Sequence, residues 1–209
     1  MTNCAIQHPK MGGLLALKQE CVSCRKCAVG GVKIAGEHLA NVLSNMNPAA
    51  EIMVVGQNPG REEIERDEPF VGEAGRRFDE AVKQILGLTR KDFYISNTIR
   101  CYTPENRKPY DSEVDNCQYF LDKEIALIQP RVIIALGSIA LKQLTGLNGV
   151  MKHHGKVVHS IRYGVPVMAV LHPSPLNTNN PERRDAFHDD LKKLKEFLDG
   201  RLGNQTTEV

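Results

Sequence analysis

Four short apolar runs alternate with longer segments of helical periodicity along most of this 209-residue chain. The runs lie at residues 51–55, 92–96, 131–136 and 165–171, and each has the length and β-branched content of a buried strand. Helical spacing covers residues 13–20, 74–86, 111–128, 138–144 and 181–198. Strands that alternate with helices pair in parallel through right-handed crossovers. We therefore predict an α/β fold, a three-layer α/β/α sandwich around a central four-stranded parallel sheet.

Length and composition fit one globular domain over residues 1–209. Hydrophobic residues make up 41% and charged residues 25% of the chain, which excludes a disordered or fibrous protein. The net charge of +2 permits a nucleic-acid partner without requiring one. No apolar run approaches the roughly 18 residues of a membrane span, and the first residues lack the build of a secretory signal. We expect a cytoplasmic protein with an N-terminal helix and cysteine segment at 1–30 and a disordered tail at 201–209.

Chemically informative residues follow directly on the predicted strands, where ligands of parallel sheets bind. The glycines of 56–60 allow close backbone approach, and the Asn97 amide offers one donor and one acceptor to a base edge. Phe70 is flanked by Pro and lies near Gly72, which suits a rigid stacking ring, although a core Phe is the ordinary interpretation. Leu176 is an apolar tip in a proline-rich loop that begins at His172, so it suits a wedge into a base stack.

Five ordered segments of the chain combine into a specific pattern. They are Gly-Gln-Asn-Pro-Gly at 56–60, Pro-Phe-Val-Gly-Glu-Ala-Gly at 69–75, Asn-Thr-Ile-Arg-Cys at 97–101, Asn-Arg-Lys-Pro at 106–109 and His-Pro-Ser-Pro-Leu at 172–176. In this order they resemble the uracil-DNA glycosylase superfamily, closest to its iron–sulfur-containing family 4. The resemblance implies a monofunctional DNA-repair enzyme that flips deoxyuridine out of DNA, hydrolyses its N-glycosidic bond and releases uracil. It also implies a monomer of prokaryotic or viral type that acts on single- or double-stranded DNA.

The resemblance further implies a role for individual residues. Phe70 would stack on the flipped uracil, and Asn97 would hydrogen-bond its O4/N3 edge. His172 would donate to O2 as negative charge builds on the leaving base. Asn58 would place the attacking water, although its amide oxygen is too weakly basic to act as a strong base. The uracil pocket would also include Gln57 and Gly60, and the DNA would be contacted by Ser174, Pro175 and Leu176.

The first motif departs from the family 4 pattern, which usually reads Gly-Glu-Ala-Pro-Gly. Gln57 and the His-Pro-Ser-Pro-Leu motif resemble family 1, while Asn58 resembles the mismatch-specific and single-strand-selective branches. Gly60 replaces a family 1 Tyr that excludes the thymine methyl, so we expect less strict base specificity. The altered motif also keeps open a second interpretation, a uracil-DNA binding or scaffold protein without turnover.

The cysteines form a second group of candidate functional residues, which could hold a metal centre. Cys101 and Cys117 lie sixteen residues apart, and the N-terminal segment offers either Cys21/Cys24 or Cys24/Cys27 as a pair. Four thiolates from two such segments can hold either zinc or a [4Fe–4S] cluster, and spacing alone does not distinguish them. A zinc protein with another ligand is therefore a third interpretation. The resemblance implies a [4Fe–4S] cluster with a structural role, held by Cys24, Cys27, Cys101 and Cys117, with Cys21 as a spare and the Cys21/Cys24 register still open.

Basic residues gather near the predicted strand ends and could contact DNA phosphates, although each could equally belong to a solvated helix face. The group consists of Arg61, Arg66, Arg76, Arg77, Arg100, Arg107 and Lys108, with a second group at 152–156.

Overall fold

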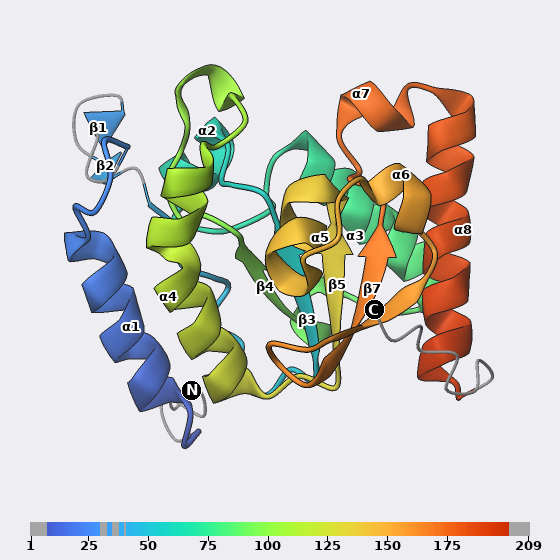
Figure 1. The fold of residues 1–209 in the computed structure, drawn as a ribbon, viewed down its shortest axis with the longest axis horizontal. Coiled ribbons are helices and arrows are strands. Elements are labelled where there is room, and N and C mark those ends of the chain that lie inside the picture. The colour runs from blue at the N-terminus through green and yellow to red at the C-terminus, as the bar shows by residue number, and fades with distance from the viewer. Residues whose placement is uncertain (1–7, 30–32, 35–37, 40, 201–209) are drawn as a thin grey trace, which may run out of the picture.

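The computed structural model describes residues 8–29, 33–34, 38–39 and 41–200, so the predicted tail at 201–209 lies outside the described residues. The centre of the fold is a five-stranded sheet with the strand order β4-β3-β5-β7-β6 (Figure 1). Its strands are β3 (Ile52–Gly56), β4 (Phe93–Asn97), β5 (Val132–Leu136), β6 (Val157–Ser160) and β7 (Val165–Val170). The four predicted strands are all present and pair in parallel.

The predicted strand number was too low by one, because β6 adds an antiparallel edge strand next to β7. Its sequence, Val-Val-His-Ser, is short for a strand, and β6 reaches β7 through the turn at 161–164, where Gly164 takes a φ of 63°. A short edge strand is a common way to finish a sheet without exposing a long unpaired edge.

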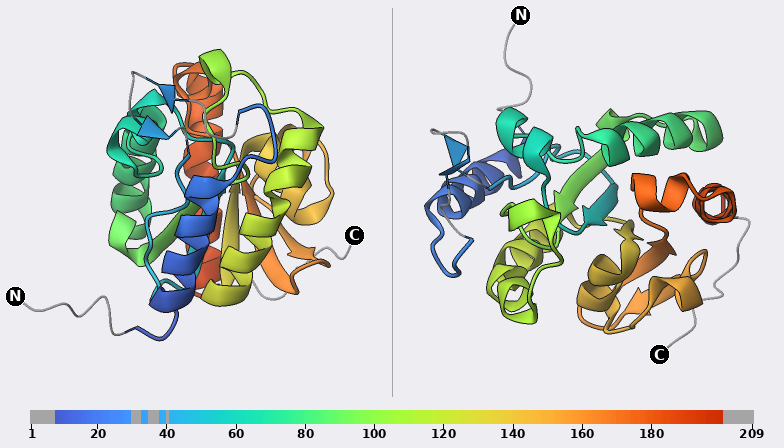
Figure 2. Two further views of the ribbon diagram at one scale, coloured as in Figure 1. Left: turned by 90° about the vertical axis from the view of Figure 1, so that its left-hand side faces the viewer. Right: turned by 90° about the horizontal axis from the view of Figure 1, so that it is seen from above.

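Helices cover both faces of the sheet, which confirms the three-layer α/β/α prediction. Figure 2 shows α3 (Glu73–Leu86) and α8 (Pro181–Leu198) on one face, and α4 (Asp111–Ile128) and α5 (Gly137–Thr145) on the other. The residues of β3, β4 and β5 are almost all buried, as expected for strands covered on both faces. The N-terminal helix α1 (Met11–Ser23) lies outside this sandwich against α4 (Figures 1 and 2).

Short elements connect these layers at the carboxyl ends of the strands and elsewhere. They are β1 (Lys33–Ile34) and β2 (His38–Leu39), which pair with each other, α2 (Arg61–Arg66), the 3-10 turns η2 (Arg90–Asp92) and η3 (Pro104–Asn106), α6 (Val150–His153) and α7 (Pro175–Thr178). Among the described residues, no helix has the length and apolarity needed to cross a membrane.

Candidate active site

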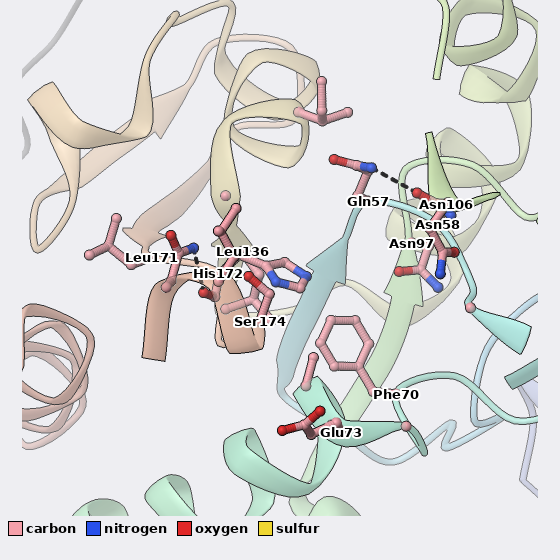
Figure 3. A pocket seen from close by; sticks show the side chains of 18 of the residues that line it. Gln57, Asn58, Phe70, Glu73, Asn97, Asn106, Leu136, Leu171, His172 and Ser174 are labelled. Carbon is pink, nitrogen blue, oxygen red and sulfur yellow. Dashed lines mark hydrogen bonds between the residues drawn. The ribbon is translucent and has the colours of Figure 1, made fainter. Parts of the chain in front are cut away.

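A cavity of about 890 Å³ opens at the carboxyl ends of the parallel strands (Figure 3). Gln57 follows β3, Asn97 ends β4, Gly137 follows β5 and His172 comes shortly after β7, and all four residues line this cavity. The volume lies within the range of roughly 300–1,000 Å³ that is usual for small-molecule sites. The topology therefore brings together the segments that the sequence placed at the strand ends.

Phe70, Asn97 and His172 converge on one side of the cavity. Gly56 pairs with Asn97 in the sheet, and a Cβ atom at Gly56 would lie 2.4 Å from Phe70 Cε2 and 2.6 Å from Asn97 Oδ1. The ring centroids of Phe70 and His172 are 5.9 Å apart. Only a glycine at position 56 lets the aromatic ring and the amide meet, so the first motif shapes this pocket through a missing side chain.

The side chain of Asn97 is buried, at 1% exposure, yet its amide has no partner among the described residues. Neither Nδ2 nor Oδ1 forms a hydrogen bond with any of them. A buried donor and acceptor left unsatisfied cost free energy, and native proteins rarely keep such groups without a function. The Asn97 amide is therefore ready for a ligand edge that carries one acceptor and one donor.

Phe70 is held in a fixed position by its backbone. Its φ of 56° lies in the left-handed region, which a bulky residue adopts only where the surroundings enforce it. The guanidinium of Arg90 donates to the carbonyl oxygen of Phe70 at 2.7 Å and also to that of Pro69. A Cβ atom at Gly75 would lie 1.8 Å from the same Phe70 oxygen, so only glycine fits there. The ring is thus presented rigidly to the cavity, as a stacking role requires.

Glu63 links the first two motifs, a role that the sequence analysis missed. Its carboxylate accepts from the backbone N–H of Gly60 at 3.0 Å and from that of Gly72 at 2.7 Å. A Cβ atom at Gly60 would lie 2.6 Å from Glu63 Oε2, so a side chain at position 60 would displace this carboxylate. The only sequence signal is a Glu three residues after Gly60, at a position that caps helix α2.

His172 faces Phe70 as a neutral imidazole. Burial lowers the pKa of His172 from 6.5 to about 4. Asn177 Nδ2 donates to the His172 carbonyl oxygen at 2.9 Å, and a Cβ atom at Gly137 would lie 3.3 Å from the His172 Cβ. The imidazole can therefore donate a hydrogen bond to a ligand without carrying charge at neutral pH.

Gln57 and Asn58 form a hydrogen-bonded amide pair on another wall of the cavity (Figure 3). Gln57 Nε2 donates to Asn58 Oδ1 at 2.8 Å. Asn58 Nδ2 donates to the carbonyl oxygen of Pro59 at 3.0 Å and to Thr103 Oγ1 at 3.3 Å. The oxygen of Asn58, which the sequence analysis assigned to the attacking water, thus already accepts one hydrogen bond.

Two exposed apolar side chains, Leu176 and Met151, line the cavity. Leu176 is 81% exposed and lies on α7, which begins at Pro175 and has Ser174 as its N-cap, so the predicted loop contains a short helix. Arg61 and Lys108 line the same cavity and form no ion pair with any described residue. These features suit contact with an extended anionic partner.

Most of the other predicted phosphate contacts are engaged within the protein. Arg100 is the clearest error of the sequence analysis, because it is 1% exposed and pairs with the buried carboxylate of Glu124. Tyr94 and Ser96 donate to the same carboxylate at 2.9 Å and 2.8 Å. The remaining ion pairs join Arg66 and Arg76 to Glu62, Arg77 to Glu73, and Arg107 to Glu113.

The described cysteines come from three parts of the chain, the end of α1 with the residues that follow it, the segment after β4, and α4, and they are close enough to influence one another. Burial raises the pKa of Cys21 to about 12; Arg100 opposes this shift, while Cys117 and Cys24 act in the same direction as burial. Burial likewise raises the pKa of Cys101, and the other four described cysteines act in the same direction, since neighbouring thiolates repel each other. Asn116 Nδ2 donates to the carbonyl oxygen of Lys26 at 3.1 Å, which ties the segment between Cys24 and Cys27 to α4.

Whether this cysteine group fits a metal depends on whether the site would hold a single ion or an iron–sulfur cluster. Within the described ranges, no three Cys, His, Asp or Glu side chains lie close enough to hold a single ion. A four-iron cluster spaces its ligands farther apart than one ion does, so this finding does not bear against a cluster. The donor set itself fits, because Fe–S clusters are held by thiolates and five cysteines influence one another here.

Comparisons with known proteins agree with this geometry. The family model described as the uracil DNA glycosylase superfamily matches residues 43–195. A type-4 uracil-DNA glycosylase of Archaeoglobus fulgidus is 36% identical over 195 residues, which cover 90% of this chain and 94% of that protein. A type-4 uracil-DNA glycosylase of Sulfurisphaera tokodaii is 33% identical, over 90% of this chain and 86% of that protein. A type-4 uracil-DNA glycosylase of Saccharolobus solfataricus is 32% identical, over 91% of this chain and 89% of that protein. The chain therefore belongs to the uracil-DNA glycosylase superfamily, with type-4 enzymes among its relatives.

Proposed function

We propose that this protein is a monofunctional uracil-DNA glycosylase, which hydrolyses the N-glycosidic bond of an extruded deoxyuridine and releases uracil. The observation that carries the proposal is the buried Asn97 amide, whose donor and acceptor both lack partners among the described residues. Uracil presents an N3–H donor and an O4 acceptor side by side, which complement the oxygen and nitrogen of that amide. Phe70 supplies the ring on which the flipped base stacks.

The chemistry follows from the charges that develop when the glycosidic bond breaks. The sugar becomes oxocarbenium-like and the leaving uracil becomes an anion, so catalysis requires a donor at O2 and a water at C1′. Neutral His172 donates to O2, where the charge grows between the ground state and the transition state. The amides of Gln57 and Asn58 place the water, which needs little deprotonation because its target is already cationic.

DNA contacts surround this pocket. Leu176 is the exposed tip that fills the gap left in the base stack, and Ser174 and Pro175 press on the backbone beside it. Arg61 and Lys108 supply positive charge for phosphates at the rim. The substrate is uracil-containing DNA, single- or double-stranded, and we propose that the enzyme acts as a monomer in the cytoplasm.

The cysteine group holds a [4Fe–4S] cluster in this proposal. Its ligands are Cys24, Cys27, Cys101 and Cys117. When bound, the cluster cross-links the N-terminal segment to α4 and to the chain that follows β4, and it takes no part in glycosidic cleavage. Cys21 is left as a spare thiol in this proposal; it lies at 2% exposure in an apolar cluster with Leu17 and Phe120.

Release of uracil under multiple turnover tests the function. Wild-type protein, incubated with an excess of a labelled oligonucleotide that contains one uracil, is expected to convert all of it to abasic product. Asn97→Ala is expected to lower kcat/KM by about 100-fold, because two hydrogen bonds to the base are lost. Binding of uracil-containing DNA without release would support a scaffold protein instead, and neither binding nor release would contradict both interpretations.

A further inference from the structure

We infer that Gln57, rather than Asn58, presents the water-binding oxygen to the pocket, and that Thr103 sets this orientation by acting through Asn58. The inference rests on the proposed function and deepens it, since it identifies Thr103 as a positioning residue for hydrolysis. Its basis is a short chain of hydrogen bonds in which Gln57 donates to Asn58, Asn58 donates to Thr103, and Thr103 donates to the carbonyl oxygen of Arg107.

The chain of hydrogen bonds begins at a buried hydroxyl. Thr103 is 0% exposed, and its Oγ1 donates to the carbonyl oxygen of Arg107 at 2.7 Å. A carbonyl oxygen only accepts, so the single hydroxyl proton of Thr103 is committed to it. The loop is fixed in turn, because Glu113 accepts two hydrogen bonds from the Arg107 guanidinium, at 2.9 Å and 2.7 Å, and one from the Tyr110 N–H at 2.8 Å.

The orientation of Asn58 follows from its two partners on that side. Thr103 Oγ1, whose proton is already used, accepts from the Asn58 amide at 3.3 Å. The carbonyl oxygen of Pro59, at 3.0 Å from the same end of the amide, can also only accept. Both partners require the nitrogen of Asn58 at this end, so its oxygen must face Gln57.

The orientation of Gln57 is then determined as well. Only a donor fits opposite Asn58 Oδ1, at 2.8 Å, and that donor is Gln57 Nε2. Figure 3 shows the Gln57 oxygen at the end of the amide that faces away from Asn58, and Gln57 lines the cavity. No hydrogen bond from the described part of the chain reaches this oxygen. It is an amide acceptor at the pocket wall, free to hold a water molecule.

Positions 57 and 58 therefore behave as a matched pair. An Asn at 58 whose oxygen points at residue 57 requires a donor there, which Gln supplies and an ionised Glu does not. An Ala at 58 would impose no such requirement.

The variant Gln57→Glu tests this arrangement through its pH profile. At pH 8 the ionised carboxylate of this variant would face Asn58 Oδ1, and we expect kcat to fall by about 10- to 100-fold, the effect of two opposed acceptors. As the pH falls toward 5.5 the carboxyl binds a proton, donates to Asn58 and turns its other oxygen to the pocket, so activity should recover. The pKa of His172 is about 4, so its neutral imidazole does not change over this range.

Two companion variants separate this role from a merely structural one. Gln57→Glu combined with Asn58→Ala removes the opposing oxygen, so the double variant should be more active at pH 8 than Gln57→Glu alone. Thr103→Val should lower kcat by about 3- to 10-fold with little change in KM, and Thr103→Ser, which keeps the hydroxyl, should restore it. Circular dichroism checks that each variant is folded.

The opposite pH profile would overturn the inference. If Gln57→Glu matches or exceeds wild type at pH 8, or gains activity as the pH rises, a carboxylate works there and the orientation of the amide pair is not what positions the water. Additive effects of Gln57→Glu and Asn58→Ala would also contradict it. Neither result would contradict the proposed function. That function is contradicted only if the wild-type protein itself does not release uracil.

Discussion

His172→Ala is expected to lower kcat for uracil release by about 10²- to 10³-fold, with a small change in KM. In the proposed mechanism the imidazole donates to the oxygen where negative charge develops, and loss of one such donor has an effect of this size. Single-turnover rates on an oligonucleotide with one uracil measure it. The conservative variant His172→Gln, which keeps an amide donor, should retain part of the rate, and a loss below 10-fold in His172→Ala would contradict the assigned role.

The pH dependence of wild-type protein provides a check on the same residue. An exposed histidine titrates near pH 6.5, whereas burial lowers the pKa of His172 to about 4. Since the shift is downward, the imidazole is neutral at every pH above about 5, and the rate should show no inflection from His172 between pH 5.5 and 8. An inflection near 6.5 that disappears in His172→Ala would show a solvated imidazole instead.

Cys101→Ser is expected to abolish iron binding altogether. Cys101 is 5% exposed and its thiol lies among the other four described cysteines, so a cluster held there would lose one of its ligands and an anchor to the chain after β4. Iron content and the visible absorbance of the purified protein measure the loss. The thermal midpoint should also fall, because metal binding adds to the free energy of unfolding.

Cys21→Ser is the matched control for this variant, since Cys21 is also buried, at 2% exposure. It should keep its iron if Cys24 and Cys27 are the N-terminal ligands. Loss of iron in Cys21→Ser together with its retention in Cys27→Ser would favour the Cys21/Cys24 register. Stoichiometric zinc without iron in wild-type protein would contradict the cluster.

The layers of the fold were predictable because they follow from local periodicity. The bounds of α4 and α8 agree with the prediction to the residue, since Gln129 leaves the helical region after α4 with a φ of 52°, and Asn180 caps α8 by accepting from the Arg183 N–H at 3.0 Å. The edge strand β6 was missed because four residues carry too little periodicity to be recognised. Strand length, rather than composition, was the limiting factor.

The position of the pocket was predictable, but the residues that hold its walls in place through hydrogen bonds were not. Asn97 and His172 were expected together because the carboxyl ends of parallel strands meet at one edge of a sheet, and the family resemblance added Phe70. Glu63 and Thr103 were not found, because they act through hydrogen bonds to groups whose position depends on the folded chain. Apart from the spacing of Glu63 after Gly60, nothing in the sequence distinguishes these two residues from ordinary surface or turn residues.

Arg100 shows that the sequence also does not reveal whether a charged side chain is exposed or buried. In the sequence it stands beside a strand end and could contact a phosphate, yet the fold buries it against Glu124, which lies twenty-four residues further along the chain. Buried arginines occur where a carboxylate and further hydrogen-bond partners are brought to them, which only the tertiary structure determines.

A crystal structure with free uracil in the pocket would test the central claim most directly. The account predicts uracil stacked on the Phe70 ring, with the Asn97 amide hydrogen-bonded to N3 and O4 and the His172 imidazole within hydrogen-bond distance of O2. Uracil bound away from these three side chains, or a pocket that stays empty at saturating uracil, would contradict it.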